Sequence, residues 1–198
     1  MTGDLNIEQA NKQGVSGGRK KIHPHKFTLW IAIGSIIMMF AGLTSAYVVR
    51  RSQANWTAYE LPVVFWYSTV AIVLSSLTMM LAVRNFKQRS MVNYRSLLTA
   101  TFVLGVIFIV LQAIGFTQFI QAGLALGKTN SVDYLYVIVS LHALHVIGGV
   151  IALAVMFAKA FSVKIRNYSS VPVEVMATYW HFVDILWLYL LLFLVMVK

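Results

Sequence analysis

The sequence predicts an all-α integral membrane protein, a bundle of five transmembrane helices with its N-terminus in the cytoplasm and its C-terminus outside. Of the 198 residues, 59% are hydrophobic and only 11% are charged, whereas a typical soluble domain carries about 25% charged residues. The chain contains several uninterrupted apolar runs, and a helix needs about 20 such residues to cross a bilayer. This composition excludes a soluble globular domain and a disordered chain.

Five segments are predicted to cross the membrane, in the domain formed by residues 27–198. Residues 1–26 are polar and basic, and we interpret them as a cytoplasmic arm. A cleavable signal peptide is not expected there, because the apolar run that follows is too long. The predicted spans are 27–49, 61–83, 97–120, 134–158 and 175–197. Pro24, Pro62 and Pro172 lie before a span or at its start, where proline does not break a helix.

The positive charges predict the orientation of the bundle. The net charge is +10, from 16 Lys and Arg against 6 Asp and Glu, which by itself would suggest a nucleic-acid partner. With the N-terminus inside, twelve cations fall on the cytoplasmic side; the four outside are Arg50, Arg51, Lys128 and Lys198. Cytoplasmic loops carry the excess of Lys and Arg in membrane proteins. Topology therefore accounts for the charge, and no nucleic-acid partner is expected.

Each span carries a stripe of small or polar residues at helical spacing. Helices in lipid associate through such residues, so we expect these stripes to face neighbouring helices. The stripes are Ser35, Met38, Gly42 and Ser45; Ser68, Ala71, Ser75, Thr78 and Ala82; Thr101, Gly105, Phe108, Gln112 and Gly115; His142, His145, Gly149 and Ala152; and Ala177, His181, Asp184 and Leu188. The remaining faces are apolar and are expected to contact lipid or a partner protein.

Four ionisable residues lie within the predicted spans: His142, His145, His181 and Asp184. Ionisable groups inside a membrane are costly and are usually functional. At about 1.5 Å per residue, His145 and Asp184 reach nearly the same depth from opposite sides of the membrane. If the fourth and fifth helices are neighbours, we expect this imidazole and this carboxylate to pair.

These residues leave four interpretations open. Two histidines three residues apart, with a ligand from the next helix, would suit a metal ion, and a histidine pair would suit a haem. Haem ligation is disfavoured because His142 and His181 differ in depth by roughly 9 Å. The chain has no cysteine, which excludes thiolate sites and disulfides, and it has no HExxH motif. We favour structural, hydrogen-bonded histidines, with a proton relay as the remaining alternative.

Four segments resemble subunit III of the haem–copper oxidases. Residues 179–187 read YWHFVDILW, which resembles the family signature YWHFVDxxW, and Glu174 precedes His181 by the family's spacing. Residues 141–149 read LHALHVIGG, similar to FHGLHVxxG. Residues 33–43 and 65–78 resemble the family's IGSExxFFAGL and FWxNTxxLxxSS segments. The resemblance marks His142, His145, Glu174, Trp180, His181 and Asp184 as signature residues with a structural role.

The resemblance implies a non-catalytic core subunit of a proton-pumping aerobic terminal oxidase, a cytochrome c oxidase, in a bacterial inner membrane. It implies packing on subunit I, contact with other oxidase subunits or a larger supercomplex, lipid binding, and support of proton uptake and turnover. Haem a and copper are expected in partner subunits, and this chain is expected to bind only phospholipid. The alternatives are subunit III of a quinol oxidase and, in another class, a small transporter or a metal-dependent membrane enzyme. Proline-free spans disfavour the transporter, which usually has broken helices.

This sequence departs from the family at three places. It corresponds to a short form with five helices, without the first two of the seven-helix members. Ile36 stands where the family often has a buried glutamate, and Gly115 follows Gln112 where a second glutamate is frequent. Any role of those carboxylates cannot be carried over to this chain.

Overall fold

The computed structural model describes residues 24–52, 61–124, 127, 130–161 and 170–197, so most of the predicted arm lies outside the described residues. Its helices are α2 (Pro24–Arg50), α3 (Val64–Lys87), α4 (Met91–Gln121), α5 (Asn130–Phe161) and α6 (Val171–Val197). All five are long and apolar enough to cross a membrane, which confirms the predicted fold class. Most helix ends extend beyond the predicted runs, since polar turns continue a helix past the hydrocarbon. The second helix instead begins at Val64, after the proline, and not at Leu61.

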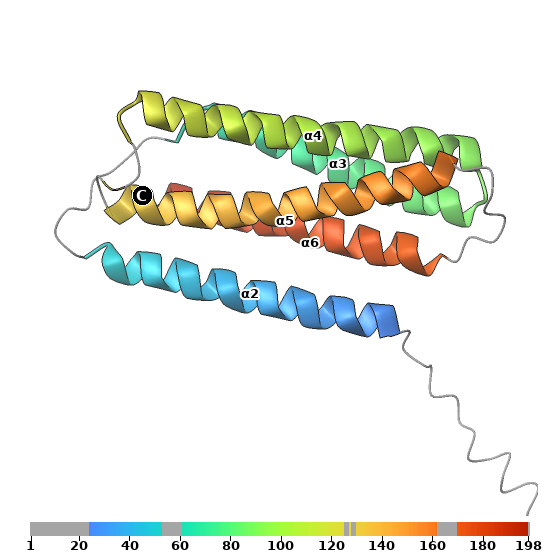
Figure 1. The fold of residues 1–198 in the computed structure, drawn as a ribbon, viewed down its shortest axis with the longest axis horizontal. Coiled ribbons are helices and arrows are strands. Elements are labelled where there is room, and N and C mark those ends of the chain that lie inside the picture. Colours follow the sequence, from blue (N-terminus) through green and yellow to red (C-terminus); the bar gives the residue numbers. More distant parts are fainter. Residues whose placement is uncertain (1–23, 53–60, 125–126, 128–129, 162–169, 198) are drawn as a thin grey trace, which may run out of the picture.

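The helices run up and down in three layers (Figure 1). α3 packs on α4, α5 packs on α6, and α2 lies along the α5–α6 pair on the opposite side from α4. Among the described residues, α2 contacts α5 and α6 but neither α3 nor α4. We call the end that carries Lys26, Lys87 and Glu174 the basic end; the charge pattern predicts that it faces the cytoplasm. α2 is thus the least enclosed helix of the bundle.

The predicted stripes of α3 and α4 face their neighbours. In α3 all five residues of the stripe are buried except Thr78, which is half-buried, and in α4 all five are buried. Close approach explains Gly105 of α4, because a Cβ there would lie 2.9 Å from the Trp180 ring. Gly149 of α5 faces the same ring at 3.1 Å. Small residues here make room for one large indole.

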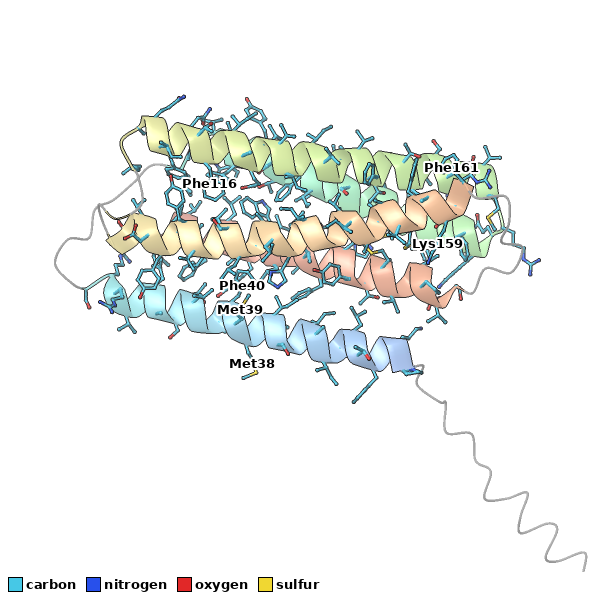
Figure 2. All side chains as sticks on the ribbon, in the orientation of Figure 1. Met38, Met39, Phe40, Phe116, Lys159 and Phe161 are labelled. Carbon is cyan, nitrogen blue, oxygen red and sulfur yellow. The ribbon has the colours of Figure 1, made fainter. Side chains whose placement is uncertain are left out.

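The predicted stripe of α2 is wrong. Met38 is 78% exposed, and Ser35, Gly42 and Ser45 are exposed as well. The buried residues are Ile33, Phe40, Thr44 and Tyr47. In Figure 2, Phe40 points from α2 towards α5, whereas Met38 points away from the bundle. Rings fill the space between α2 and its neighbours, so bulk and not small size defines this interface.

The stripes of α5 and α6 are correct except at their last residues. Ala152 and Leu188 are both exposed, whereas Leu153 and Leu191 are buried. A helix turns by 3.6 residues, so a stripe written at fixed spacing drifts off the buried face after a few turns. In α5 the buried position is the next residue, Leu153, and in α6 it is Leu191, three residues after Leu188.

Candidate functional site

Glu174, in the first turn of α6, joins three helices at the basic end. Its Oε2 accepts a hydrogen bond from the Lys26 Nζ of α2 at 2.8 Å, and its Oε1 pairs with the Lys87 Nζ of α3 at 3.2 Å. An acidic group is also favoured at a helix N-terminus, where the backbone N–H groups are unpaired. The two lysine side chains are 42% and 56% exposed. Two cations on one carboxylate leave this end with a surplus positive charge.

A groove of about 430 Å³ opens between α2, α3 and α6. It is lined by the ion-paired Lys26 and Glu174, by apolar side chains that include Trp30 and Met80, and by His181. The groove exists because α2 does not contact α3 in the described residues. It therefore presents an apolar wall beside charged groups at the level of the basic end.

Tandem hydroxyl residues on α3 hold the aromatic and imidazole groups of α6. The indole Nε1 of Trp180 donates to the Ser75 Oγ at 3.0 Å, and Nε1 of Trp187 donates to the Thr69 Oγ1 at 3.0 Å. Ser76 Oγ lies 2.6 Å from His181 Nδ1. Because α3 and α6 are antiparallel, residues late in one helix meet residues early in the other.

Hydroxyl residues of α3 also bond to α4. The Gln112 Nε2 donates to the Ser68 Oγ at 2.9 Å. Ser75 Oγ donates to the Thr101 carbonyl at 3.4 Å, and the Thr78 and Thr101 hydroxyls are 2.9 Å apart. Ser68 faces α4, and Ser75 meets both α4 and α6. Thr69 and Ser76, the residues directly after them, bond to α6. Polar groups in this seam therefore satisfy one another across three helices.

His142 lies in an aromatic cage at the centre of the bundle. Its ring stacks on Trp187 of α6, with 5.2 Å between centroids and 28° between planes. Phe40 of α2 and Phe108 of α4 meet it edge-on at 6.4 and 6.1 Å. The residue is 1% exposed, and neither ring nitrogen has a hydrogen-bond partner in the described part of the chain. His142 therefore packs as an aromatic ring, not as the hydrogen-bonded residue that we expected.

His145 and Asp184 do not pair, so that hypothesis is wrong. The Nδ1 of His145 donates to the Leu141 carbonyl of its own helix at 2.7 Å. Asp184 is 3% exposed, and neither carboxylate oxygen has a hydrogen-bond partner among the described residues. Equal depth does not fix the direction in which two helices point their side chains. The hydrogen bond that joins His145 to α6 is instead the one from the Tyr179 hydroxyl, which donates to the His145 carbonyl at 3.0 Å.

The histidines and carboxylates do not converge. Within the described ranges, no three His, Cys, Asp or Glu residues are grouped closely enough to hold a metal ion. His142, His145 and His181 have three separate environments: an aromatic cage, a backbone carbonyl and a serine. The arrangement can join helices and can hold protons, and it offers no assembled ligand set.

Sequence reasoning missed several partners of the signature residues. It did not single out Lys26, Lys87, Thr69 or Ser76, although each contacts one of those residues. A sequence signal exists for the α3 residues, because hydroxyl pairs at 68–69 and 75–76 are seven residues apart, like Trp180 and Trp187. Seven residues are nearly two helical turns, so both pairs meet the same neighbour.

Fold and site define a helical integral membrane protein whose spanning segments are joined by buried hydroxyl, indole and imidazole groups. The family model for cytochrome c oxidase subunit III matches residues 25–197, and the chain belongs to this family. It is subunit III of a haem–copper oxidase, a component of respiratory electron transport that works within a multi-subunit complex.

Curated relatives are similar over most of their length. The chain is 28% identical to a probable cytochrome c oxidase subunit 3 of Nocardia farcinica, over 85% of this chain and 89% of that protein. It is 24% identical to cytochrome c oxidase subunit 3 of Bacillus sp. strain PS3, over 81% and 80%. It is also 29% identical to cytochrome bo(3) ubiquinol oxidase subunit 3 of Buchnera aphidicola, over 82% and 88%.

Proposed function

We propose that this chain is the non-catalytic subunit III of a proton-pumping cytochrome c oxidase in a bacterial plasma membrane. In this role it packs on subunit I, contacts other subunits or a larger supercomplex, and sustains proton uptake and turnover. Haem a and copper would lie in the partner subunits. The observation that carries the proposal is how the polar groups of α6 are used: Trp180, His181 and Trp187 all bond to α3. A scaffold that stabilises a partner needs this internal rigidity.

The outer faces of the bundle support a role in assembly. Large apolar side chains are exposed along α4, including Val103, Val106 and Val110. In a membrane such faces contact acyl chains or the apolar helices of a partner. The exposed glycines of α2 also support this, because a Cβ at Gly34 or Gly42 would meet nothing within 4 Å. A neighbouring helix can approach α2 closely along this side.

The groove at the basic end supports the binding of a phospholipid. Trp30, Met80 and Val83 give it an apolar wall for an acyl chain, and Lys26 offers a cation at the level of the headgroups. Anionic headgroups attract Lys and Arg at the cytoplasmic surface. Bound lipid in this position would fill the space that separates α2 from α3.

Cytochrome c is the proposed electron donor, and a quinol is the alternative. The family description and the relatives from Nocardia and Bacillus are named for cytochrome c oxidases. The relative from Buchnera is named for a ubiquinol oxidase, which supports a quinol as the alternative donor. Purified complex that oxidises reduced cytochrome c and not a quinol would support the proposal, and the reverse preference would replace the donor.

Deletion of the gene tests the proposed role in turnover. We expect membranes that lack this chain to keep most of their haem a, while oxygen consumption declines early during sustained turnover. Complementation with the wild-type chain should restore the sustained rate. Loss of the haem signal itself would show that the chain is needed to build the catalytic centre, and that result would contradict a purely supporting role.

A further inference from the structure

The groove between α2, α3 and α6 carries its charged side chains at one end only. Along α6 its lining extends from Glu174 to His181, which is about 10 Å of helix. Lys26 lies with Glu174 at the first end, and Trp30 and Met80 are among the apolar side chains that line the groove. The groove therefore follows the helix axis, as acyl chains do in a bilayer. A phospholipid has the same asymmetry, with a charged headgroup at one end of its apolar chains.

Polar groups further along the groove already have partners in the protein. The Thr178 hydroxyl donates to the Glu174 carbonyl of its own helix at 2.9 Å. The Nδ1 of His181 lies 2.6 Å from the Ser76 Oγ. These groups are engaged without any ligand, so this part of the groove suits an apolar chain. Recognition of a headgroup is left to the end at Lys26.

The charges at that end favour an anion. Glu174 pairs with Lys26 through one oxygen and with Lys87 through the other, so two positive charges meet one negative charge. Within the described ranges, Glu174 is the only acidic residue at the basic end, which also carries Arg84 and Arg89. An ammonium group has three N–H donors, so Lys26 can hold a second acceptor while it stays paired. A phosphate oxygen would be such an acceptor.

The same pairs disfavour a zwitterionic headgroup. Its ammonium group would need a carboxylate, but both oxygens of Glu174 already pair with lysines. A third cation at this place would be repelled by Lys26 and Lys87. An anionic headgroup such as phosphatidylglycerol brings the phosphate without the ammonium. Basic pockets between transmembrane helices at the cytoplasmic side bind anionic headgroups in this way.

We propose that the groove selects an anionic phospholipid over a zwitterionic one, with the phosphate at Lys26 and an acyl chain beside Trp30 and Met80. The inference rests on the proposed lipid site and names the class of lipid that it takes. In this arrangement Glu174 limits the positive charge of the site and does not bind the lipid. The bound chain would lie between α2 and α3, which do not contact each other in the described residues.

Fluorescence of Trp30 in lipid vesicles tests this selectivity. The full chain is placed in phosphatidylcholine vesicles that contain a small share of lipid brominated on its acyl chains, because bromine quenches a nearby indole. The difference between the wild type and Trp30→Phe isolates the Trp30 signal. We expect brominated phosphatidylglycerol to bind about fivefold more tightly than brominated phosphatidylcholine, the attraction of roughly one basic residue. Trp66, 53% exposed near the other end of α3, should show no such preference.

Three charge variants identify the groups that select the lipid. Lys26→Gln should abolish the preference for phosphatidylglycerol. Glu174→Gln should keep or increase it, because removal of the carboxylate leaves both lysines uncompensated. Arg95→Gln is the matched control for the loss of one cation, since the Arg95 guanidinium lies over the Phe161 ring between α4 and α5; it should leave the preference unchanged.

The outcomes separate the class of lipid from the lipid site itself. Equal affinities of phosphatidylglycerol and phosphatidylcholine at Trp30 would overturn the selectivity and leave the lipid site in place. A preference for phosphatidylethanolamine that is lost in Glu174→Gln would overturn it in favour of a zwitterionic lipid. Val83→Phe fills the groove without a change of charge, and it should reduce the quenching of Trp30 by brominated lipid. Unchanged quenching in that variant would show that no lipid occupies the groove.

Discussion

The imidazole of His142 stacks on the indole of Trp187, with 5.2 Å between their centroids. The contact joins α5 to α6, and these two residues belong to the two segments that most resemble the oxidase family. A ring that makes no hydrogen bond in the described structure stabilises the bundle through its shape and its π-face. This relationship explains how a histidine in the membrane can be structural without any polar partner.

Replacement of His142 by phenylalanine tests that interpretation. An apolar ring of similar shape removes the desolvation cost of the imidazole, so we expect His142→Phe to retain or raise the unfolding midpoint in detergent. His142→Ala should lower it, because loss of a buried ring costs about 3–5 kcal/mol. A strong loss of stability in the phenylalanine variant, equal to that of the alanine variant, would show that the ring nitrogens matter.

The hydrogen bond from Trp187 to Thr69 should contribute modestly to the free energy of unfolding. Trp187→Phe removes the donor and keeps an aromatic ring, and interhelical hydrogen bonds in membranes average about 0.6 kcal/mol. A double-mutant cycle with Thr69→Val measures the coupling free energy of unfolding directly. Trp66→Phe is the control, because Trp66 is 53% exposed. A coupling energy of zero in the cycle would show that this hydrogen bond does not stabilise the protein.

Substitutions at two adjacent glycines of α5 distinguish the effect of close packing from the effect of helix propensity. A Cβ at Gly149 would lie 3.1 Å from both Trp180 and Tyr179, whereas one at Gly148 would meet nothing within 4 Å. We expect Gly149→Ala to lower the free energy of unfolding by about 1–3 kcal/mol, as overpacking does. Gly148→Ala should leave it unchanged or raise it. Equal effects at both positions in a denaturation series would contradict the packing of Trp180.

The ion pairs of Glu174 should control the position of α2 more than overall stability. Both lysines are substantially exposed, and exposed pairs contribute about 0–1 kcal/mol. We expect Glu174→Gln to change the unfolding midpoint little and to broaden the distance distribution between spin labels at Leu29→Cys and Val83→Cys. The absence of native cysteine makes this labelling specific. The exchange Lys26→Glu with Glu174→Lys should narrow the distribution again; unchanged distributions throughout would show that the pairs do not hold α2.

Arg89 adopts a backbone conformation that suits glycine. Its φ is 59°, in the turn where Ser90 N donates to the Asn85 carbonyl at 3.0 Å and ends α3. The left-handed region costs an L-residue about 1–2 kcal/mol, and glycine is the usual residue at this place. We expect Arg89→Gly to raise the unfolding midpoint, and Gln88→Gly, at φ −80°, to lower it. The reverse order of the two variants would contradict the turn.

Periodicity and hydropathy predict the five helices because the bilayer imposes length and continuity. They also predict the α3 and α4 seams, where small and hydroxyl residues let backbones approach. They fail on α2, because Phe40 and Tyr47 fill a wide interface that a rule based on small residues does not detect. They also fail for His145 and Asp184, since depth follows from residue count but side-chain direction depends on helix rotation. The ion pairs of Glu174 join residues 148 and 87 positions apart, which no local pattern reveals.

Purification through a C-terminal tag in mild detergent tests whether this chain is a structural subunit of a haem–copper oxidase. We expect the chain to be recovered with a large multi-helix partner and with the absorption spectrum of haem a. His145→Ala should leave the metal content per complex unchanged, because His145 bonds to a backbone carbonyl. Recovery of the chain alone, without haem and without that partner, would show that it is not a subunit of such an oxidase.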